Sequence, residues 1–304
     1  MVDEDIERKI ILAGKIACQV RREGAARIVE GASYLEVMDF CERRIKELGG
    51  GVAWAQMAIN EVAAHFCPEE TETGVFAVGD LVKIDIGVHI EGYIADNAMT
   101  VEVGGKTTLN QELIKTSQEA LKAAIKLVRP GVKLWELGEA QNSEAEKAGF
   151  KIVRNLSGHS IEQYKVHAGI SIPTYNTSEK TELTQGMQIA IEPFITNGVG
   201  LIKEGTTPTI FMVATKRMPR SPYARKILEF VAPQKGLPFT TRWITRALGR
   251  GPATLGMREL LREGIVRAYP PLPEVKGGKV AQFEHSMIVK DKTLVYTRHV
   301  DDTW

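Results

Sequence analysis

Apolar residues recur at every third or fourth position near the start of the chain, with charged residues between them. These positions are Ile6, Ile10, Ala13, Ala17 and Val20. The spacing places them on one face of an amphipathic helix, which we predict over residues 5–31. A second helix is predicted from Ser33 to Gly49, because Ser33 followed by Glu36 is a typical helix N-cap pattern.

Strands and helices alternate along the rest of the chain. Apolar runs that are alternating or cut off by Gly or Pro predict strands over residues 81–88, 92–96, 187–192 and 280–289. Helical periodicity returns over residues 110–128 and 132–148. This mixture predicts the α+β class.

The segment between Lys216 and Arg262 differs in charge from the rest of the chain. It contains 11 Lys and Arg residues against only Glu229 and Glu259, a local balance of +9. The amphipathic stretches that predict short helices here are residues 222–231, 240–248 and 253–263. We therefore predict a helical subdomain inserted into the mixed body.

The composition excludes several classes of protein. Of the 304 residues, 43% are hydrophobic and 25% are charged, so we expect a packed core and no general disorder. The net charge of +1 gives no overall attraction to nucleic acid or to an anionic membrane. Cys18, Cys41 and Cys67 contain no CxxC pair, which excludes a disulfide framework and a thiolate zinc site. No signal peptide or membrane span is predicted, so we expect a cytoplasmic globular protein.

Two aspartates lie in the hairpin predicted around residue 90. If the turn is centred between Ile90 and Glu91, Asp85 lies directly opposite Asp96. Opposed carboxylates repel each other, and a bound divalent cation would convert this repulsion into coordination. In the alternative, one aspartate is a turn residue in a different register and no metal is needed.

Two glutamates stand among apolar residues in predicted strands. Glu192 lies in the strand over 187–192 and Glu284 in the strand over 280–289. Taken alone, each fits the solvated face of a sheet better than it fits a functional site.

Three of the six histidines lie in distinctive local sequences. His159 and His167 can share a site only if the chain folds back between them, and Gly158 and Gly169 permit such bends. His65 ends a short apolar stretch. A single histidine is more often structural than functional, so none of them is decisive alone.

Together these residues resemble a known family, the methionine aminopeptidases, and specifically the short archaeal form of the type 2 branch. The order Asp, Asp, His, Glu, Glu over about 200 residues, each in its expected local sequence, is highly specific. The resemblance covers nearly the whole chain. The segments that carry it are INEVAAH (59–65), VKIDIGVHIEGYIAD (82–96), SGHSI (157–161), AIEPF (190–194) and QFEH (282–285).

The resemblance implies a pita-bread fold, in which two similar β-rich halves surround a central site and helices cover the outside. It implies a catalytic domain over residues 1–202 and 269–304, with an inserted helical subdomain similar to a winged helix over residues 203–268. The implied activity is removal of the N-terminal methionine from nascent proteins and peptides, with a preference for a small second residue.

The resemblance also implies a centre with two divalent metal ions. Asp85 chelates one ion, and His159 and Glu192 bind the other. Asp96 and Glu284 bridge both ions. These oxygen and imidazole donors suit Mn, Fe, Co or Zn better than Cu(I). Two ions about 3.5–4 Å apart lower the pKa of a water molecule that then attacks the first peptide carbonyl.

Further residues receive roles from the same resemblance. His167 contacts the scissile amide or its tetrahedral intermediate, and His65 contacts the substrate and takes part in proton transfer. Glu192 carries the proton from water to the leaving amine. Tyr269 lines the methionine pocket. The chain departs from the family ahead of His65, where VAWAQM (52–57) replaces the usual Phe-Pro pair, so we expect Trp54 or Met57 to fill that space.

The implied partners are peptides and nascent chains that begin with methionine. The basic insert is a candidate for contact with the ribosome, and no sequence feature demands a dimer, so we expect a monomer. One alternative is an Xaa-Pro dipeptidase, which shares the fold and ligands but usually has an additional N-terminal domain. Another is a non-catalytic ribosome- or RNA-binding paralogue, which would have lost metal ligands.

Overall fold

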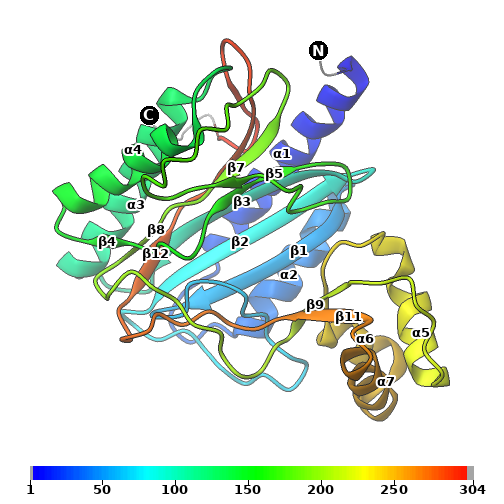
Figure 1. Cartoon of the computed structure of the whole chain (residues 1–304). Helices are drawn as coiled ribbons and strands as arrows, with labels where there is room; N and C mark the ends of the chain where they lie inside the picture. The colour runs from blue at the N-terminus through cyan, green and yellow to red at the C-terminus, as the bar shows by residue number, and fades with distance from the viewer. Residues whose placement is uncertain (1–2, 300–304) are drawn as a thin grey trace.

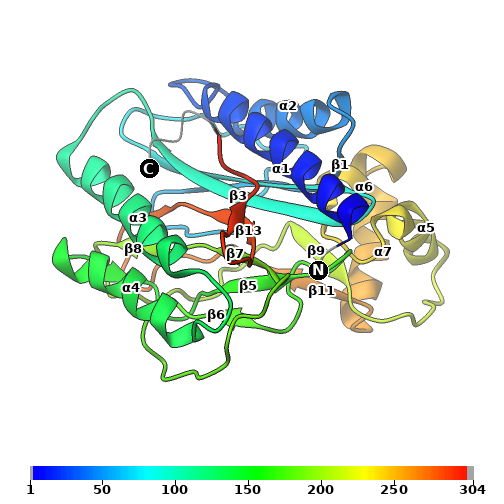
Figure 2. The same cartoon turned by 90° about the horizontal axis from the view of Figure 1, so that it is seen from above.

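Two helices cover one face of a three-stranded antiparallel sheet in the N-terminal half of the chain (Figure 1, Figure 2). The computed structural model describes residues 3–299. The elements of this half are α1 (Glu4–Ala25), α2 (Tyr34–Glu47), β1 (Gly51–Ile59), β2 (Leu81–Ile90) and β3 (Tyr93–Glu102). Ser33 caps α2 by accepting a hydrogen bond from the backbone N–H of Glu36, as predicted. Helix α1 is shorter than predicted, because a turn follows Ala25.

The central strand β2 is buried along most of its length. Residues 81–88 are all buried, because α1 packs against β2 and β3 on one face and the second half of the molecule covers the other. This explains why β2 is a nearly continuous apolar run rather than an alternating one. The core on the helical side includes Ile10, Ile16, Met38, Ile45, Ile84 and Ile86.

The turn between β2 and β3 lies one residue further along the chain than predicted. Glu91 and Gly92 form a two-residue turn that is closed by the pair Ile90 and Tyr93. Both turn residues have positive φ, 51° and 88°. Two-residue hairpin turns with this backbone match the twist of the strands they connect, and glycine favours them.

This turn changes the register of the two aspartates. Asp85 pairs with Ala98 and Asp96 pairs with Gly87, so the predicted direct opposition of Asp85 and Asp96 is wrong. The pairing is shifted by two residues from the predicted one. Because side chains alternate with a period of two, both aspartates still lie on the same face of the hairpin, as diagonal neighbours.

A second helix pair and two further sheets form the other half of the molecule (Figure 1). Helices α3 (Thr108–Leu127) and α4 (Leu134–Lys147) pack against each other, and α3 contacts β8 and β12. The sheets have the strand orders β12-β8-β4 and β14-β13-β7-β5-β6. Their strands are β4 (Lys151–Ile152), β5 (Gly158–Ile161), β6 (Ser171–Ile172), β7 (Gln188–Ile191), β8 (Phe194–Thr196), β12 (Val280–Gln282), β13 (His285–Ile288) and β14 (Leu294–Val295).

Two glutamates mark the points where the chain passes between these sheets. Glu192 and Pro193 separate β7 from β8, and Phe283 and Glu284 separate β12 from β13. The strand predicted over residues 280–289 is therefore two strands. At both joints the chain leaves one ladder and enters the other, which frees the glutamate from the ordinary alternation of a strand.

The segment between β8 and β12 forms a subdomain with its own core, beside α2 (Figure 1). Helices α5, α6 and α7 match the three predicted helices, but a three-stranded sheet, β10-β9-β11, accompanies them. These strands have only two to four residues each, too few for a periodicity to be recognised. The boundaries 203 and 268 stay predictions. The elements are β9 (Ile210–Val213), α5 (Pro222–Val231), a 3-10 helix (Ala232–Gln234), β10 (Phe239–Thr240), α6 (Thr241–Leu248), α7 (Arg250–Arg262) and β11 (Val266–Tyr269).

The helices are amphipathic rather than uniformly apolar. Helix α1, for example, buries Ile10 and Val20, whereas Arg8 and Lys15 are exposed. Within residues 3–299, no helix has both the length and the apolar character that crossing a membrane requires.

Candidate metal centre

All five residues predicted to bind metal line one cavity of about 150 Å³. Asp85 comes from β2, Asp96 from β3 and His159 from β5. Glu192 and Glu284 come from the two strand joints. Both halves of the molecule therefore supply side chains to the cavity, and the acids do not lie on a solvated sheet face.

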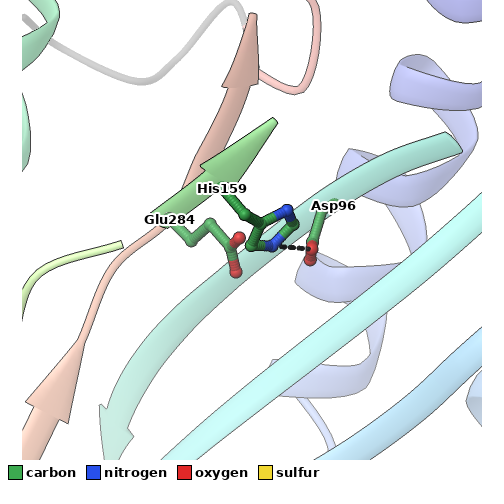
Figure 3. A group of neighbouring side chains, drawn as sticks. All are labelled: Asp96, His159 and Glu284. Atoms are coloured by element: carbon green, nitrogen blue, oxygen red, sulfur yellow. Dashed lines mark ion pairs between the residues drawn. The ribbon is translucent and has the colours of Figure 1, made fainter. Parts of the chain in front are cut away.

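Three of these side chains converge closely (Figure 3). The ligand atoms of Asp96, His159 and Glu284 all lie within 4.8 Å of one another. His159 Nε2 is 3.4 Å from Asp96 Oδ2 and 3.8 Å from Glu192 Oε1. Gln282 Nε2 donates to Glu192 Oε2 at 3.1 Å, so one oxygen of Glu192 is held while the other is nearer His159.

Backbone and hydroxyl contacts bring Asp96 beside the joint that carries Glu284. The backbone N–H of Glu284 donates to the carbonyl of Ala98 at 3.0 Å. Ser286 Oγ accepts from the backbone N–H of Asp96 at 3.1 Å and donates to the carbonyl of Asp96 at 2.8 Å. These contacts join β3 to the other half of the molecule at the height of the cavity.

Two side chains of β1 hold Asp85 by both of its oxygens. Trp54 Nε1 donates to Asp85 Oδ1, and Gln56 Nε2 donates to Asp85 Oδ2, each at 2.7 Å. Trp54 lines the cavity as predicted, but its contact with Asp85 was not foreseen. Gln56 was missed as well. A polar residue in the buried apolar strand 51–59 was the signal that could have found it.

Burial and mutual repulsion raise the pKa values of the four carboxyl groups. Burial, and then the charge of Asp96, raises the pKa of Asp85 to about 8, although the Trp54 and Gln56 donors act in the opposite direction. Burial raises the pKa of Asp96 to about 8 as well. Burial, followed by the charge of Asp96, raises the pKa values of Glu192 and Glu284 well above the usual range. The cluster therefore lacks compensating positive charge.

The donor set fits a divalent cation. Among the described residues, Asp96 Oδ1 and Glu284 Oε1 are buried oxygens without a hydrogen-bond partner. Buried polar atoms are normally satisfied, so these oxygens need a partner of another kind. Burial lowers the pKa of His159 to about 4, so its imidazole is neutral at pH 7 and offers a lone pair. Carboxylates and neutral imidazole together are ligands for Mn, Fe, Co or Zn.

His65, His167 and Tyr269 also line this cavity. The His167 ring lies edge-on to the His159 ring, with centroids 4.5 Å apart, and the His65 ring lies edge-on to Tyr269 at 5.7 Å. Burial is the main cause that lowers the pKa values of His65 and His167 to about 4. Both are therefore neutral at pH 7, and each can donate one hydrogen bond and accept another.

The predicted fold-back between His159 and His167 is present, and of the two predicted bends the one at Gly169 is confirmed and the one at Gly158 is not. Tyr164 (φ 57°) and Gly169 (φ 106°) adopt the left-handed conformations that reverse the chain. Gly158 lies within β5, where a Cβ would come 2.3 Å from the carbonyl oxygen of Ala190. Its glycine is needed for the close approach of two strands, not for a bend.

The inserted subdomain supplies one wall of the cavity. Its lining residues from the subdomain are Ile210 and Met212 of β9, Pro238 and Tyr269. The other walls come from the main body, which comprises the two β-rich halves. Apart from Tyr269, these residues were missed, because apolar side chains in short strands have no distinctive sequence signal.

The chain is similar to known proteins over nearly its whole length. The model of metallopeptidase family M24 matches residues 8–291. The methionine aminopeptidase of Archaeoglobus fulgidus is 44% identical over 292 residues, which cover 95% of this chain and 97% of that protein. A crystal structure of methionine aminopeptidase from Thermotoga maritima matches with a TM-score of 0.73 at 22% identity, covering 98% of both chains. A thermophilic Arx1 structure matches with a TM-score of 0.88 at 15% identity, covering 100% of this chain and 93% of that one. These two structures show the fold alone.

Fold, site and relatives agree on the class of protein. The arrangement of two β-rich halves around a buried cluster of acids and imidazole fits a metallopeptidase. The chain belongs to metallopeptidase family M24. The predicted pita-bread fold is confirmed, and so is the expected use of divalent metal, whose identity is not specified.

Proposed function

We propose that this protein removes the N-terminal methionine from peptides and nascent chains by hydrolysing the first peptide bond. The observation that carries the proposal is the convergence of the five expected ligands on one buried cavity. The 44% identity to a methionine aminopeptidase over nearly the full length supports the choice of substrate.

The five acidic and imidazole side chains divide between two metal positions in this proposal. Asp85 holds one ion, His159 and Glu192 hold the other, and Asp96 and Glu284 are shared. Bound divalent ions polarise the peptide carbonyl and make water a stronger nucleophile. The two unpartnered oxygens of Asp96 and Glu284 support their shared position.

Glu192 is suited to carry a proton between water and the leaving amine. Gln282 holds one of its oxygens, while the other lies near His159 inside the cavity. A carboxylate in this position can accept a proton from the attacking water and return it to the amine.

His65 and His167 are suited to bind the reacting amide. Because both are neutral, they can donate to the carbonyl oxygen or accept from the amide N–H without adding charge to the cavity. His167 is closer to the metal ligands, since its ring contacts His159, whereas His65 contacts Tyr269.

The methionine side chain fits the apolar wall of the cavity. Ile210, Met212 and Tyr269 line it, and a thioether gains about 0.3–1.5 kcal/mol from a contact with an aromatic ring. A cavity of about 150 Å³ has room for a group the size of benzene. Little space then remains beside the ligands, which supports a preference for a small second residue.

Hydrolysis of Met-Ala-Ser by the parent protein, with Mn, Fe, Co or Zn supplied in turn, tests the function. His159→Ala is expected to lose at least one ion per chain and to reduce kcat by at least about a hundredfold, because a metal ligand is removed. His89→Ala is the control, since its ring packs against Tyr164 and does not line the cavity. A parent that releases no methionine with any metal, or that prefers Xaa-Pro dipeptides, would contradict the proposal.

Contact with the ribosome, the cytoplasmic location and the monomeric state stay predictions. Of the 11 cations in the basic insert, the buried Arg242 and the partly exposed Arg246 bind acids of α2, outside the insert. The other nine are exposed, although Arg262 pairs with Glu263 at 3.7 Å and Lys235 lies over the Tyr164 ring. Co-sedimentation with ribosomes that weakens as salt increases would support the contact, whereas absent or salt-insensitive co-sedimentation would exclude it.

A further inference from the structure

The two faces of the sheet in the inserted subdomain have different surroundings, the cavity on one side and the core of the subdomain on the other. On one face, Ile210, Met212 and Tyr269 line the cavity. On the other face, Phe211 and Val266 belong to the subdomain's own core. This is the ordinary alternation of strand side chains, used here to make a core on one side and a substrate wall on the other.

The wall and the metal ligands therefore belong to different bodies. The five candidate ligands come from strands and joints of the two β-rich halves, which together form the main body, whereas Ile210 and Met212 come from the insert. The width of the pocket between them depends on how firmly the insert is seated. The contacts that hold the insert against the main body then contribute to substrate recognition.

Arg242 of α6 makes the most buried of these contacts. Its side chain is 0% exposed. Its guanidinium donates to Glu42, and its Nε lies 3.3 Å from Asp39 Oδ1, so both acids of α2 are engaged. It also donates to the carbonyl of Pro68 at 2.7 Å, three residues after His65. One side chain therefore joins the insert, α2 and the His65 loop.

Neighbouring residues of α6 extend this clamp. Arg246 donates to both oxygens of Asp39 at 2.8 Å, and Trp243 Nε1 donates to Glu42 at 2.9 Å. Paired hydrogen bonds of this kind fix orientation as well as distance.

The clamp lies close to the cavity wall along the chain. Thr240, two residues before Arg242, pairs with Ile210 in the β10–β9 ladder. Pro238, four residues before Arg242, itself lines the cavity. A displacement of α6 is therefore transmitted to the wall through a few residues of strand.

We propose that Arg242 is a positioning residue for the substrate side chain, because it holds the insert wall against the main body that carries the candidate ligands. The inference rests on the proposed function. Arg242 does not touch the substrate. It acts through Ile210, Pro238 and the other wall residues, and through the His65 loop.

Two variants test the proposal in the full-length protein. Arg242→Met combined with Glu42→Gln removes the central pair without leaving a buried charge unpaired. Arg246→Met breaks the outer part of the clamp, where the side chain is 39% exposed, and folds even if the first variant does not. The control is Arg44→Met on the same helix α2, which breaks the pair of Arg44 with Glu23 at 2.8 Å, away from the insert.

The measurements are kinetics with Met-Ala-Ser and Leu-Ala-Ser, the Kd for L-methionine, bound metal per chain and Tm. We expect the Arg242→Met/Glu42→Gln variant to raise KM and the Kd for L-methionine by about tenfold or more, since a pocket misfit of one methylene has effects of this size. Arg246→Met should produce a smaller change in the same direction. The preference for Met over Leu should fall in both, kcat should change less than KM, and metal content should equal that of the parent.

A merely structural role predicts a different result. Both variants would then lower Tm but keep the parental KM, Kd and Met-over-Leu preference at temperatures where they are folded, and this result would overturn the proposal. Failure of the proposed function is distinguishable, because it appears in the parent as absent hydrolysis. In that case the Kd for L-methionine still tests the role of Arg242. A parent protein that neither hydrolyses the peptide nor binds methionine overturns both the proposed function and the proposal for Arg242.

Discussion

Trp54 and Gln56 show how two side chains can hold a candidate metal ligand in place. Asp85 carries a raised pKa because it is buried, and two donors at 2.7 Å oppose that rise and fix the orientation of its carboxylate. Groups that hold a ligand in this way commonly affect metal affinity by 10- to 100-fold, or about 1–3 kcal/mol. Trp54 is therefore placed to affect the chemical step as well as the pocket.

Trp54→Phe keeps the ring but removes the N–H donor. We expect it to weaken metal binding by about 10- to 100-fold and to lower kcat together with kcat/KM, because Asp85 loses one of its two donors. Titration calorimetry with the metal and steady-state kinetics measure the two effects. Trp135→Phe on α4 is the control. An increase in KM alone, with unchanged metal affinity, would show that Trp54 serves only the substrate side chain.

At the scale of elements, the three strands β1, β2 and β3 approach closely at Gly87. Gly87 pairs with Trp54 on one side and with Asp96 on the other. A Cβ at position 87 would come 2.3 Å from the Trp54 ring. The glycine thus permits the sheet to place an indole beside Asp85.

Gly87→Ala should displace the Trp54 ring, which neighbours Gly87 on strand β1. We expect it to destabilise the protein by about 1–3 kcal/mol, as overpacking does, and to weaken metal binding as the indole moves away from Asp85. Urea unfolding and metal titration measure these changes. Gly105→Ala is the control, because its Cβ would meet nothing closer than 3.9 Å. Equal stability and metal affinity in both variants would contradict the close packing.

At the scale of the whole molecule, the buried acids couple folding to metal. In the metal-free fold the pKa values of Asp85 and Asp96 are about 8, whereas in an unfolded chain an aspartate has a pKa of about 3.9. The fold therefore binds more protons than the unfolded chain between these values. The stability linked to these two groups is complete below pH about 4 and is lost as the pH rises through about 8.

The stability linked to these carboxyl groups should therefore fall between pH 6 and pH 8.5 in the metal-free protein, and bound metal should prevent this loss. We expect the rise in Tm on adding metal to be larger at pH 8.5 than at pH 6 by at least about 4 °C. His159 does not contribute to this difference, because its pKa is lowered to about 4 and its imidazole is neutral in the fold at both pH values. Calorimetry with and without metal measures the difference. Equal Tm shifts at both pH values would show that the pKa values of these acids are not raised in the metal-free fold.

The candidate ligands could be predicted well because their signals are local. Asp85, Asp96, His159, Glu192 and Glu284 are chemically suited to metal, and each has a specific sequence around it. The structure brings all five to one cavity, although their roles stay predictions. The hairpin register was wrong because the turn residues, Glu91 and Gly92, were placed one position too early.

The sequence by itself determined the elements, the class of chemistry and the candidate ligands, since hydrophobic period, capping residues and donor type are properties of neighbouring residues. Only the tertiary structure decided what surrounds those ligands. The contact of Trp54 with Asp85, the passage between sheets at Glu192 and Glu284, and the seating of the insert by Arg242 join residues far apart in the chain. Such contacts depend on how sheets and helices pack against one another, and packing leaves no periodic trace in any one segment.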